Sequence, residues 1–202
     1  MDRRFRLDPA ADPLVVVNRA GAAAIDTPRL VLRGWREEDK EPFFRHTNTE
    51  SVMRWLGGVK TREFLDGAID KFAAWQAERG FTFWAVERKE DAALLGFCGL
   101  KRADDAGSPV EGEIEIGWRL REDCWGRGYA KEAAIASLDF AFERVGAERV
   151  VALTVEGNGP SWGLMERLGM TRRPDLDYGG VSWAEGPIVI YSIAREEWST
   201  DS

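Results

Sequence analysis

A glycine turn between an apolar stretch and a helical stretch constrains this chain more than any other feature. Gly126 and Gly128 stand in the run Trp125–Ala133, after the strand-like residues 114–120 and before the helix-like residues 130–144. Glycines at such a place let the backbone approach a ligand closely and aim free N–H groups at it. The combination of strand, glycine turn and helix N-terminus favours a site for a phosphorylated group.

The residues in and around the turn limit which kinds of phosphate site the turn can form. It lacks the third glycine of a dinucleotide fingerprint and the Gly-Lys-Ser/Thr end of a nucleotide P-loop. The chain carries a net charge of −7, yet four cations gather about the turn: Arg119, Arg121, Arg127 and Lys131. Cations beside a helix N-terminus reinforce an anion site. The alternative is an ordinary tight turn whose cations are solvated and balanced by neighbouring acids.

Further landmarks follow in a fixed order. Glu113–Trp118 precedes the turn, and Asn158–Ser161 and Leu164–Met170 follow it after one more strand. This order resembles the GNAT superfamily of acetyl-CoA-dependent N-acetyltransferases. Within that superfamily it is most similar to the ribosomal-protein-alanine (RimJ/RimL-type) branch, for which the opening Thr27–Arg33 is also typical. The resemblance covers the chain from about residue 27 to about residue 197.

The resemblance implies a mixed α/β (α+β) fold, the GNAT acyl-CoA N-acyltransferase fold. Its central sheet is expected to have seven mostly antiparallel strands, splayed between the fourth and fifth, with helices on both faces. Apolar patterning predicts these strands over 30–34, 81–87, 94–101, 113–120, 149–155, 170–173 and 187–194. We expect an N-terminal extension over 1–26 and a single acetyltransferase domain over 27–198.

One long helix is predicted from Thr61 to Gly80. Apolar side chains recur there at helical spacing and form one stripe: Phe64, Leu65, Ala68, Ile69, Phe72 and Trp75. A glycine commonly closes a helix of this kind, so Gly80 marks its end.

Composition excludes several classes of protein. The acidic balance argues against nucleic-acid binding, and no apolar run is long enough to cross a membrane. Cys98 and Cys124 are too few for a disulfide scaffold, so we expect reduced thiols in a cytoplasmic protein without a secretory signal. No Cys, His and acid cluster has metal-ligand spacing. The expected partner is an amine acceptor, and the expected assembly is a monomer or homodimer.

Glu115 is the first candidate for a general base. Period two places Glu113, Glu115 and Gly117 on one face of their strand. An α-amino group titrates near 8 and lysine near 10.4, so an amine must lose a proton before it attacks, and a carboxylate can accept that proton. In the resembled family a glutamate at the position of Glu115 can act as general base, and Glu113 is the second candidate. The alternative is that Glu115 only forms a hydrogen bond or pairs with an arginine.

The resemblance implies a full set of cofactor contacts. The backbone of Trp118, Arg119 and Leu120 is expected to pair with the pantetheine arm of acetyl-CoA in the splayed gap. The pyrophosphate is expected to bind at the turn, made by Trp125, Gly126, Arg127, Gly128, Tyr129, Ala130 and Lys131. Asn158 and Ser161 are expected to bond the cofactor. Asn158 and its neighbours also suit a helix start, with Pro160 in the first turn.

The acceptor is expected to lie between two segments, 52–59 and 177–186, which flank the open end of the cleft in this family. Trp55, Tyr178 and Trp183 are its candidate contacts there.

Met165 departs from the family pattern, because many members have a tyrosine there that protonates the leaving thiolate. Water, Tyr129, Ser161 and Cys124 are the alternatives for this acid.

The predicted function is acetyl transfer from acetyl-CoA to a primary amine, by direct attack on the thioester. The expected amine is a protein or peptide N-terminus. A small amine is one alternative acceptor, such as an antibiotic, a polyamine or an amino acid. The other alternative is a catalytically silent protein that binds CoA or serves as an interaction module, and Met165 favours this alternative.

Overall fold

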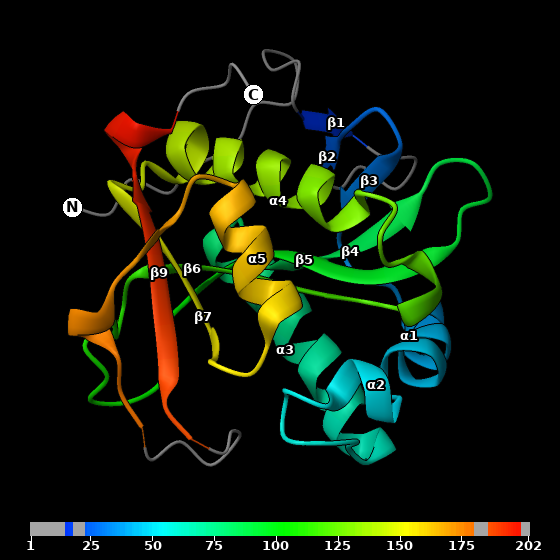
Figure 1. Cartoon of the computed structure of the whole chain (residues 1–202). Coiled ribbons are helices and arrows are strands. Elements are labelled where there is room, and N and C mark those ends of the chain that lie inside the picture. Colours follow the sequence, from blue (N-terminus) through cyan, green and yellow to red (C-terminus); the bar gives the residue numbers. More distant parts are fainter. Residues whose placement is uncertain (1–14, 18–22, 180–185, 199–202) are drawn as a thin grey trace.

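The computed structural model describes residues 15–17, 23–179 and 186–198. One open sheet runs through them in the order β1-β2-β3-β4-β5-β6-β7-β9-β8 (Figure 1). Its neighbouring strands are antiparallel, except that β6 and β7 are parallel. The strands are β1 (Val15–Val17), β2 (Ala23–Asp26), β3 (Leu30–Arg33), β4 (Phe83–Arg88), β5 (Leu94–Arg102), β6 (Ile114–Leu120), β7 (Arg149–Val155), β8 (Thr171–Arg172) and β9 (Ile188–Ala194). The predicted mixed fold with a mostly antiparallel sheet is confirmed.

Seven of these strands, β3 to β9, are the ones that the sequence predicts. β1 and β2 extend the sheet beyond β3, through pairs such as Val16↔Ala24 and Ile25↔Leu32. They come from the region that the sequence assigns to an extension. The predicted count of seven strands is therefore too low, because the sequences of β1 (VVV) and β2 (AAID) show no alternation of apolar and polar residues.

The sheet parts between β6 and β7, as predicted. These strands pair at only two positions, Ile114↔Val150 and Glu115↔Val151. β6 stays paired with β5 along its whole length, and β7 stays paired with β9. Each strand therefore follows its other neighbour, and the two diverge beyond Glu115.

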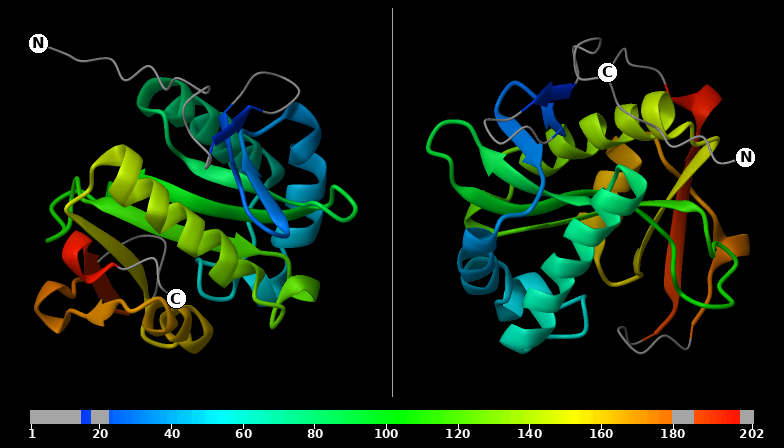
Figure 2. Two further views of the ribbon diagram at one scale, coloured as in Figure 1. Left: turned by 90° about the horizontal axis from the view of Figure 1, so that it is seen from above. Right: turned by 180° about the vertical axis from the view of Figure 1, so that it is seen from behind.

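Helices cover both faces of the sheet (Figure 2). α4 and α5 pack over Ile116 and Ala152 in one buried cluster, whereas α1 and α3 pack over Phe83 and Phe97 on the opposite face. The helices are α1 (Lys40–Thr47), α2 (Glu50–Met53), α3 (Arg62–Arg79), α4 (Tyr129–Phe140) and α5 (Gly159–Arg167). Short helical turns are η1 (Glu37–Asp39), η2 (Glu122–Cys124), the π-helical η3 (Ala141–Val145), η4 (Pro174–Leu176) and η5 (Arg195–Glu197).

The predicted long helix is α3. Thr61 caps it by accepting a hydrogen bond from the Phe64 N–H at 3.2 Å, and Gly80 ends it with a φ of 82°. Leu65, Ile69 and Phe72 are its buried residues. The predicted stripe also includes Phe64, but this residue is 61% exposed. Among the described residues, no helix is apolar and long enough to cross a membrane.

Candidate active site

The glycine turn, residues 125–131, joins the end of β6 and η2 to α4. Gly126 and Gly128 have φ angles of 71° and 79°, in the left-handed region that favours glycine. Within the described part of the chain, no backbone N–H of residues 126–131 donates to an acceptor. Trp125, at the start of the turn, is 49% exposed. The turn therefore presents open N–H groups at a helix N-terminus, which is the arrangement that binds anions.

Arg29, in the bend between β2 and β3, holds this turn from the side. Its Nη1 donates to the Arg127 carbonyl at 2.9 Å, and its Nε donates to Glu132 Oε2 at 2.6 Å. Thr27 also donates to Glu132, at 2.6 Å. The Arg29 guanidinium lies 4.6 Å from the centre of the Tyr129 ring. The one acid in the first turn of α4 is thus paired, so its charge repels an anion at the turn only weakly.

Two of the four cations predicted around the turn are available there. Arg127 and Lys131 are exposed and form no ion pair with a described residue. Arg121 instead pairs with Asp123 at 2.6 Å. Arg119 is buried, with its side chain against the face of the sheet that carries α1 and α3. Arg127 and Lys131 are therefore the side chains that can reach outer phosphates.

The backbone of β6 offers donors to the opening between β6 and β7. The Glu113 carbonyl accepts from the N–H of Ala103, the residue after β5, at 2.9 Å, and the Arg121 N–H donates to the Leu95 carbonyl of β5 at 2.8 Å. Alternate residues of a strand turn their backbone groups to the same neighbour. The N–H of Arg119 therefore faces β5, whereas those of Trp118 and Leu120 face the opening. Two of the three predicted backbone contacts lie where a ligand strand could pair with them.

Glu115 is the last residue at which β6 still pairs with β7. Its side chain is 12% exposed, and Lys101 Nζ approaches its Oε2 to 3.1 Å. That oxygen is buried and receives no hydrogen bond of good geometry, so the contact is an ion pair only. Burial raises the pKa of Glu115 to about 7, although Lys101 opposes the rise. Lys101 also pairs with Asp104, which keeps part of its charge away from Glu115.

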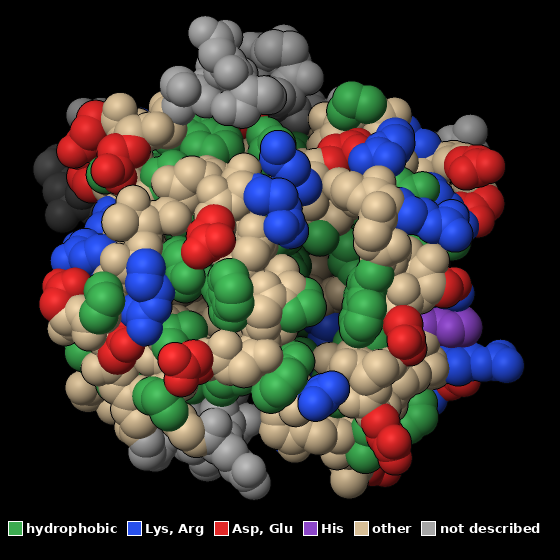
Figure 3. All heavy atoms as spheres, in the orientation of Figure 1, with side chains coloured by type: hydrophobic (Ala, Val, Ile, Leu, Met, Phe, Trp, Pro, Cys, Tyr) green, Lys and Arg blue, Asp and Glu red, His purple; other side chains and the backbone are tan. Residues whose placement is uncertain are grey.

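Two of the predicted acceptor contacts line one side of the opening. The Trp55 ring lies against Gly157, where a Cβ would come within 2.7 Å of it, so the segment after α2 reaches the segment after β7. The Tyr178 hydroxyl donates to Asp105 at 2.6 Å. Trp55 and Tyr178 pack on one cluster with the β7 and β9 side chains. Trp183 lies outside the described residues. Figure 3 shows this face hollowed beside α5, with apolar side chains around the hollow.

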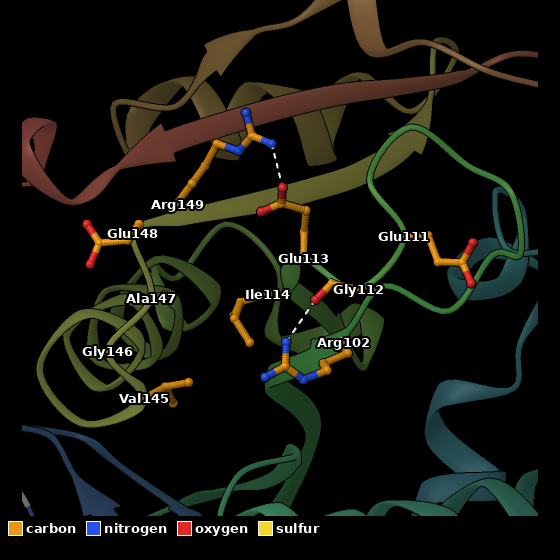
Figure 4. A pocket seen from close by; sticks show the side chains of 10 residues that line it. All are labelled: Arg102, Glu111, Gly112, Glu113, Ile114, Val145, Gly146, Ala147, Glu148 and Arg149. Carbon is orange, nitrogen blue, oxygen red and sulfur yellow. Dashed lines mark hydrogen bonds and ion pairs between the residues drawn. The ribbon is translucent and has the colours of Figure 1, made fainter.

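Glu113, two residues before Glu115, has a different partner and faces a different pocket. It pairs with Arg149 at 2.6 Å, and both line a pocket of about 680 Å³ at the end of β6 away from the glycine turn (Figure 4). Arg102 closes another side of this pocket and donates to the Gly112 carbonyl. The pocket is charged and far from the open N–H groups, so it is not the candidate active site.

The helix after β7 starts as predicted, with Pro160 in its first turn. Asn158 precedes α5, but its side chain does not cap the helix and instead donates to Thr154 Oγ1 at 3.0 Å. Ser161 is half-buried and its hydroxyl makes no hydrogen bond within the described residues. Met165 is buried in the core, so it has no access to a leaving group.

Comparison with known proteins places the chain among acetyltransferases. Residues 29–171 match the family model described as an acetyltransferase (GNAT) domain. The chain is 29% identical over 180 residues to a Bacillus subtilis protein named uncharacterized N-acetyltransferase YnaD, with 87% of this chain and 99% of that protein covered. A crystal structure of an acetyltransferase from Agrobacterium tumefaciens has a TM-score of 0.71 at 26% identity, with 84% and 93% of the two chains covered.

One shorter match has a more specific name. Over 90 residues the chain is 37% identical to the FsC-acetyl coenzyme A-N(2)-transacetylase of Aspergillus fumigatus. This match covers 42% of the chain and 37% of that protein.

Proposed function

Since the chain belongs to the GNAT family of N-acetyltransferases, we propose that it transfers the acetyl group of acetyl-CoA to the α-amino group of a protein or peptide, as RimJ/RimL-type enzymes do. The observation that carries this proposal is Glu115. Its buried carboxyl group has a pKa of about 7 and stands where the two central strands part.

The pKa of Glu115 favours an α-amine over a lysine side chain. An α-ammonium group titrates near 8 and a lysine near 10.4. Moving a proton to Glu115 is therefore uphill by about 1 kcal/mol from an α-ammonium and by about 5 kcal/mol from lysine. A base of this strength suits the more acidic of the two ammonium groups, which is the α-ammonium.

Acetyl-CoA, the donor of the acetyl group, would lie in the opening between β6 and β7 and at the glycine turn. The open N–H groups of residues 126–131, with Arg127 and Lys131 outside them, would hold the pyrophosphate. The N–H groups of Trp118 and Leu120 would pair with the pantetheine arm and with the thioester oxygen. The cosubstrate supplies an activated acetyl group, and the chain supplies the alignment of the two reactants.

The reaction needs three events at this place. The neutral amine nitrogen attacks the thioester carbonyl carbon, and Glu115 accepts the proton of the ammonium directly or through a water. An N–H of β6 stabilises the negative charge that develops on the carbonyl oxygen. The C–S bond then breaks, the thiolate leaves, and the second proton of the former ammonium nitrogen passes to that thiolate or to water. A thiol has an ordinary pKa near 8.5, so release as thiolate is feasible with Met165 in place of an acid.

Two measurements test the proposal. Isothermal titration with acetyl-CoA should show binding, and none up to millimolar cofactor would contradict it. Thiol release should then be followed with a lysine-free peptide amide and with an N-terminally blocked lysine peptide. Faster turnover of the free α-amine is expected. Normal acetyl-CoA binding with lost turnover in Glu115→Gln would also exclude a silent binding module.

A small amine is the second candidate acceptor, and the match to the FsC transacetylase favours it. Activity on small amines alone, with none on any peptide, would replace the first proposal by this one.

A further inference from the structure

Arg119 is a buried cation without a buried partner. Its side chain is 9% exposed, and its hydrogen bond to the Met53 sulfur, at 3.0 Å, is the one contact of this kind found among the described residues. Its Nε is buried and has no acceptor. The Phe43 and Phe97 rings lie 4.5 and 5.2 Å from the guanidinium carbon. These rings orient the guanidinium but leave its charge uncompensated.

The other buried arginine of the fold shows what is missing. Arg33, 3% exposed, is paired with Asp39 at 2.7 Å and with Glu87 at 2.6 Å. A buried charge is costly unless it is paired, and a guanidinium does not escape this cost by losing its proton. Arg119 has no such carboxylates among the described residues, so its counter-charge is expected to arrive with a ligand.

The position of Arg119 indicates which ligand brings the charge. Its side chain lies on the face of β6 that carries α1 and α3, whereas the glycine turn leads into α4 on the other face. The phosphates of acetyl-CoA, held at that turn, are therefore on the wrong side of the sheet. Arg119 keeps 9% of its surface exposed, and Figure 3 shows Lys or Arg atoms at the floor of the hollow beside α5.

Arg119 and Glu115 bracket one stretch of the same strand face. They are four residues apart, so their Cα atoms are about 13 Å apart, and Gly117 between them has no side chain. An amine in front of Glu115 could thus belong to a molecule that also reaches Arg119.

We propose that Arg119 binds a carboxylate of the acceptor, so that the acceptor class is an amine that also carries an acid group several ångströms from its nitrogen. This inference rests on the proposed acetyl transfer. The carboxylate has two sources, an acidic side chain at the start of a peptide or the carboxylate of a free amino acid. A bidentate pair with a guanidinium would position either one.

The test compares acceptors that differ only in this charge. The pairs are a glutamyl-alanyl-alanine amide and its glutaminyl counterpart, an alanyl-glutamyl-alanine amide and its glutaminyl counterpart, and alanine and alaninamide. Wild type should prefer the acidic member of at least one pair by about tenfold or more in kcat/KM. The peptide pairs report a side-chain source, and the alanine pair reports a free amino acid.

Variants then assign the preference to Arg119. Arg119→Met should reduce kcat/KM for the preferred acid by about 10- to 100-fold and change its neutral partner by less than about threefold. Arg119→Lys should keep part of the preference, because the charge stays. Arg45→Met is the matched control, since this exposed arginine lies outside the site, and it should change neither value.

A binding measurement keeps the inference testable without turnover. Calorimetry with CoA present compares the N-acetylated acidic peptide with its amide, on wild type and on Arg119→Lys. Tighter binding of the acid to wild type supports the inference. Equal rates and equal affinities within every pair, or equal losses for acid and amide in Arg119→Met, would overturn it. Failure to bind acetyl-CoA would instead overturn the proposed function.

Discussion

Replacing Glu115 by glutamine should stabilise the protein at neutral pH while it removes activity. The carboxyl group is nearly enclosed, and its Oε2 receives no directed hydrogen bond. Burial therefore raises its pKa from 4.5 to about 7, which means that the folded state resists ionisation of this group. Glutamine fills nearly the same volume without a charge, and Lys101 keeps Asp104 as a partner.

The size of the effect follows from the two pKa values. Below pH 4.5 Glu115 is protonated in both folded and unfolded chains, and it adds no pH dependence. Between pH 4.5 and 7 the unfolded chain releases the proton while the folded chain keeps it, so the free energy of unfolding falls as the pH rises. Above pH 7 the full penalty is present, about 3 kcal/mol at 1.36 kcal/mol per pKa unit. Glu115→Gln should be more stable than wild type by up to this amount at pH 8 and by almost nothing at pH 4.

Urea unfolding of both proteins at several values between pH 4 and 8 measures this difference. Glu113→Gln is the matched control, because that carboxylate is partly exposed and paired with Arg149, and its loss should cost less than about 1 kcal/mol. The same two variants should differ in activity. Glu115→Gln is expected to lose about 10²- to 10⁴-fold in kcat, and Glu113→Gln little. A stability difference that does not change with pH, or a Glu115→Gln protein that is less stable at pH 8, would refute the reasoning.

Three further changes test the rest of the site. Gly126→Ala forces a side chain into a left-handed backbone (φ 71°) and should cost about 1–2 kcal/mol in urea unfolding, with weaker acetyl-CoA binding by calorimetry. Arg29→Ala removes the bond to the Arg127 carbonyl and should weaken acetyl-CoA binding about fivefold. An unchanged Kd would show that Arg29 does not shape the turn. Trp55→Ala should raise the KM for a peptide acceptor and leave acetyl-CoA affinity unchanged, and a loss of both would place Trp55 elsewhere.

Local patterns predicted the elements of the site that depend on neighbours in sequence. The glycine turn, the start of α5 at Pro160 and the placement of Glu115 on its strand face all follow from short spacings and from the two-residue period. β1 and β2 were not predicted, because the pairing of β1 with β2 and of β2 with β3, rather than any pattern of their own, makes them strands.

Features that depend on register could not be predicted in this way. Lys101 meets Glu115 because β5 pairs with β6 in one particular register, and the sequence does not state that register. The sequence groups Arg119 with the cations around the glycine turn, because it lies only a few residues before Gly126. Strand alternation also places the Arg119 side chain on the face of Glu115, away from α4. This alternation is the feature of the sequence that predicts where Arg119 lies.

The parting of β6 and β7 makes the sheet two ladders joined by a seam of two residue pairs. Beyond the seam, the amides of Trp118 and Leu120 have no strand to protect them from solvent. A molecule laid into the opening would act as a missing strand and join the ladders. Its arrival should slow hydrogen exchange at these two amides, and it should raise the unfolding temperature with the logarithm of its concentration. A cosubstrate bound in the opening would therefore stabilise the sheet as well as react.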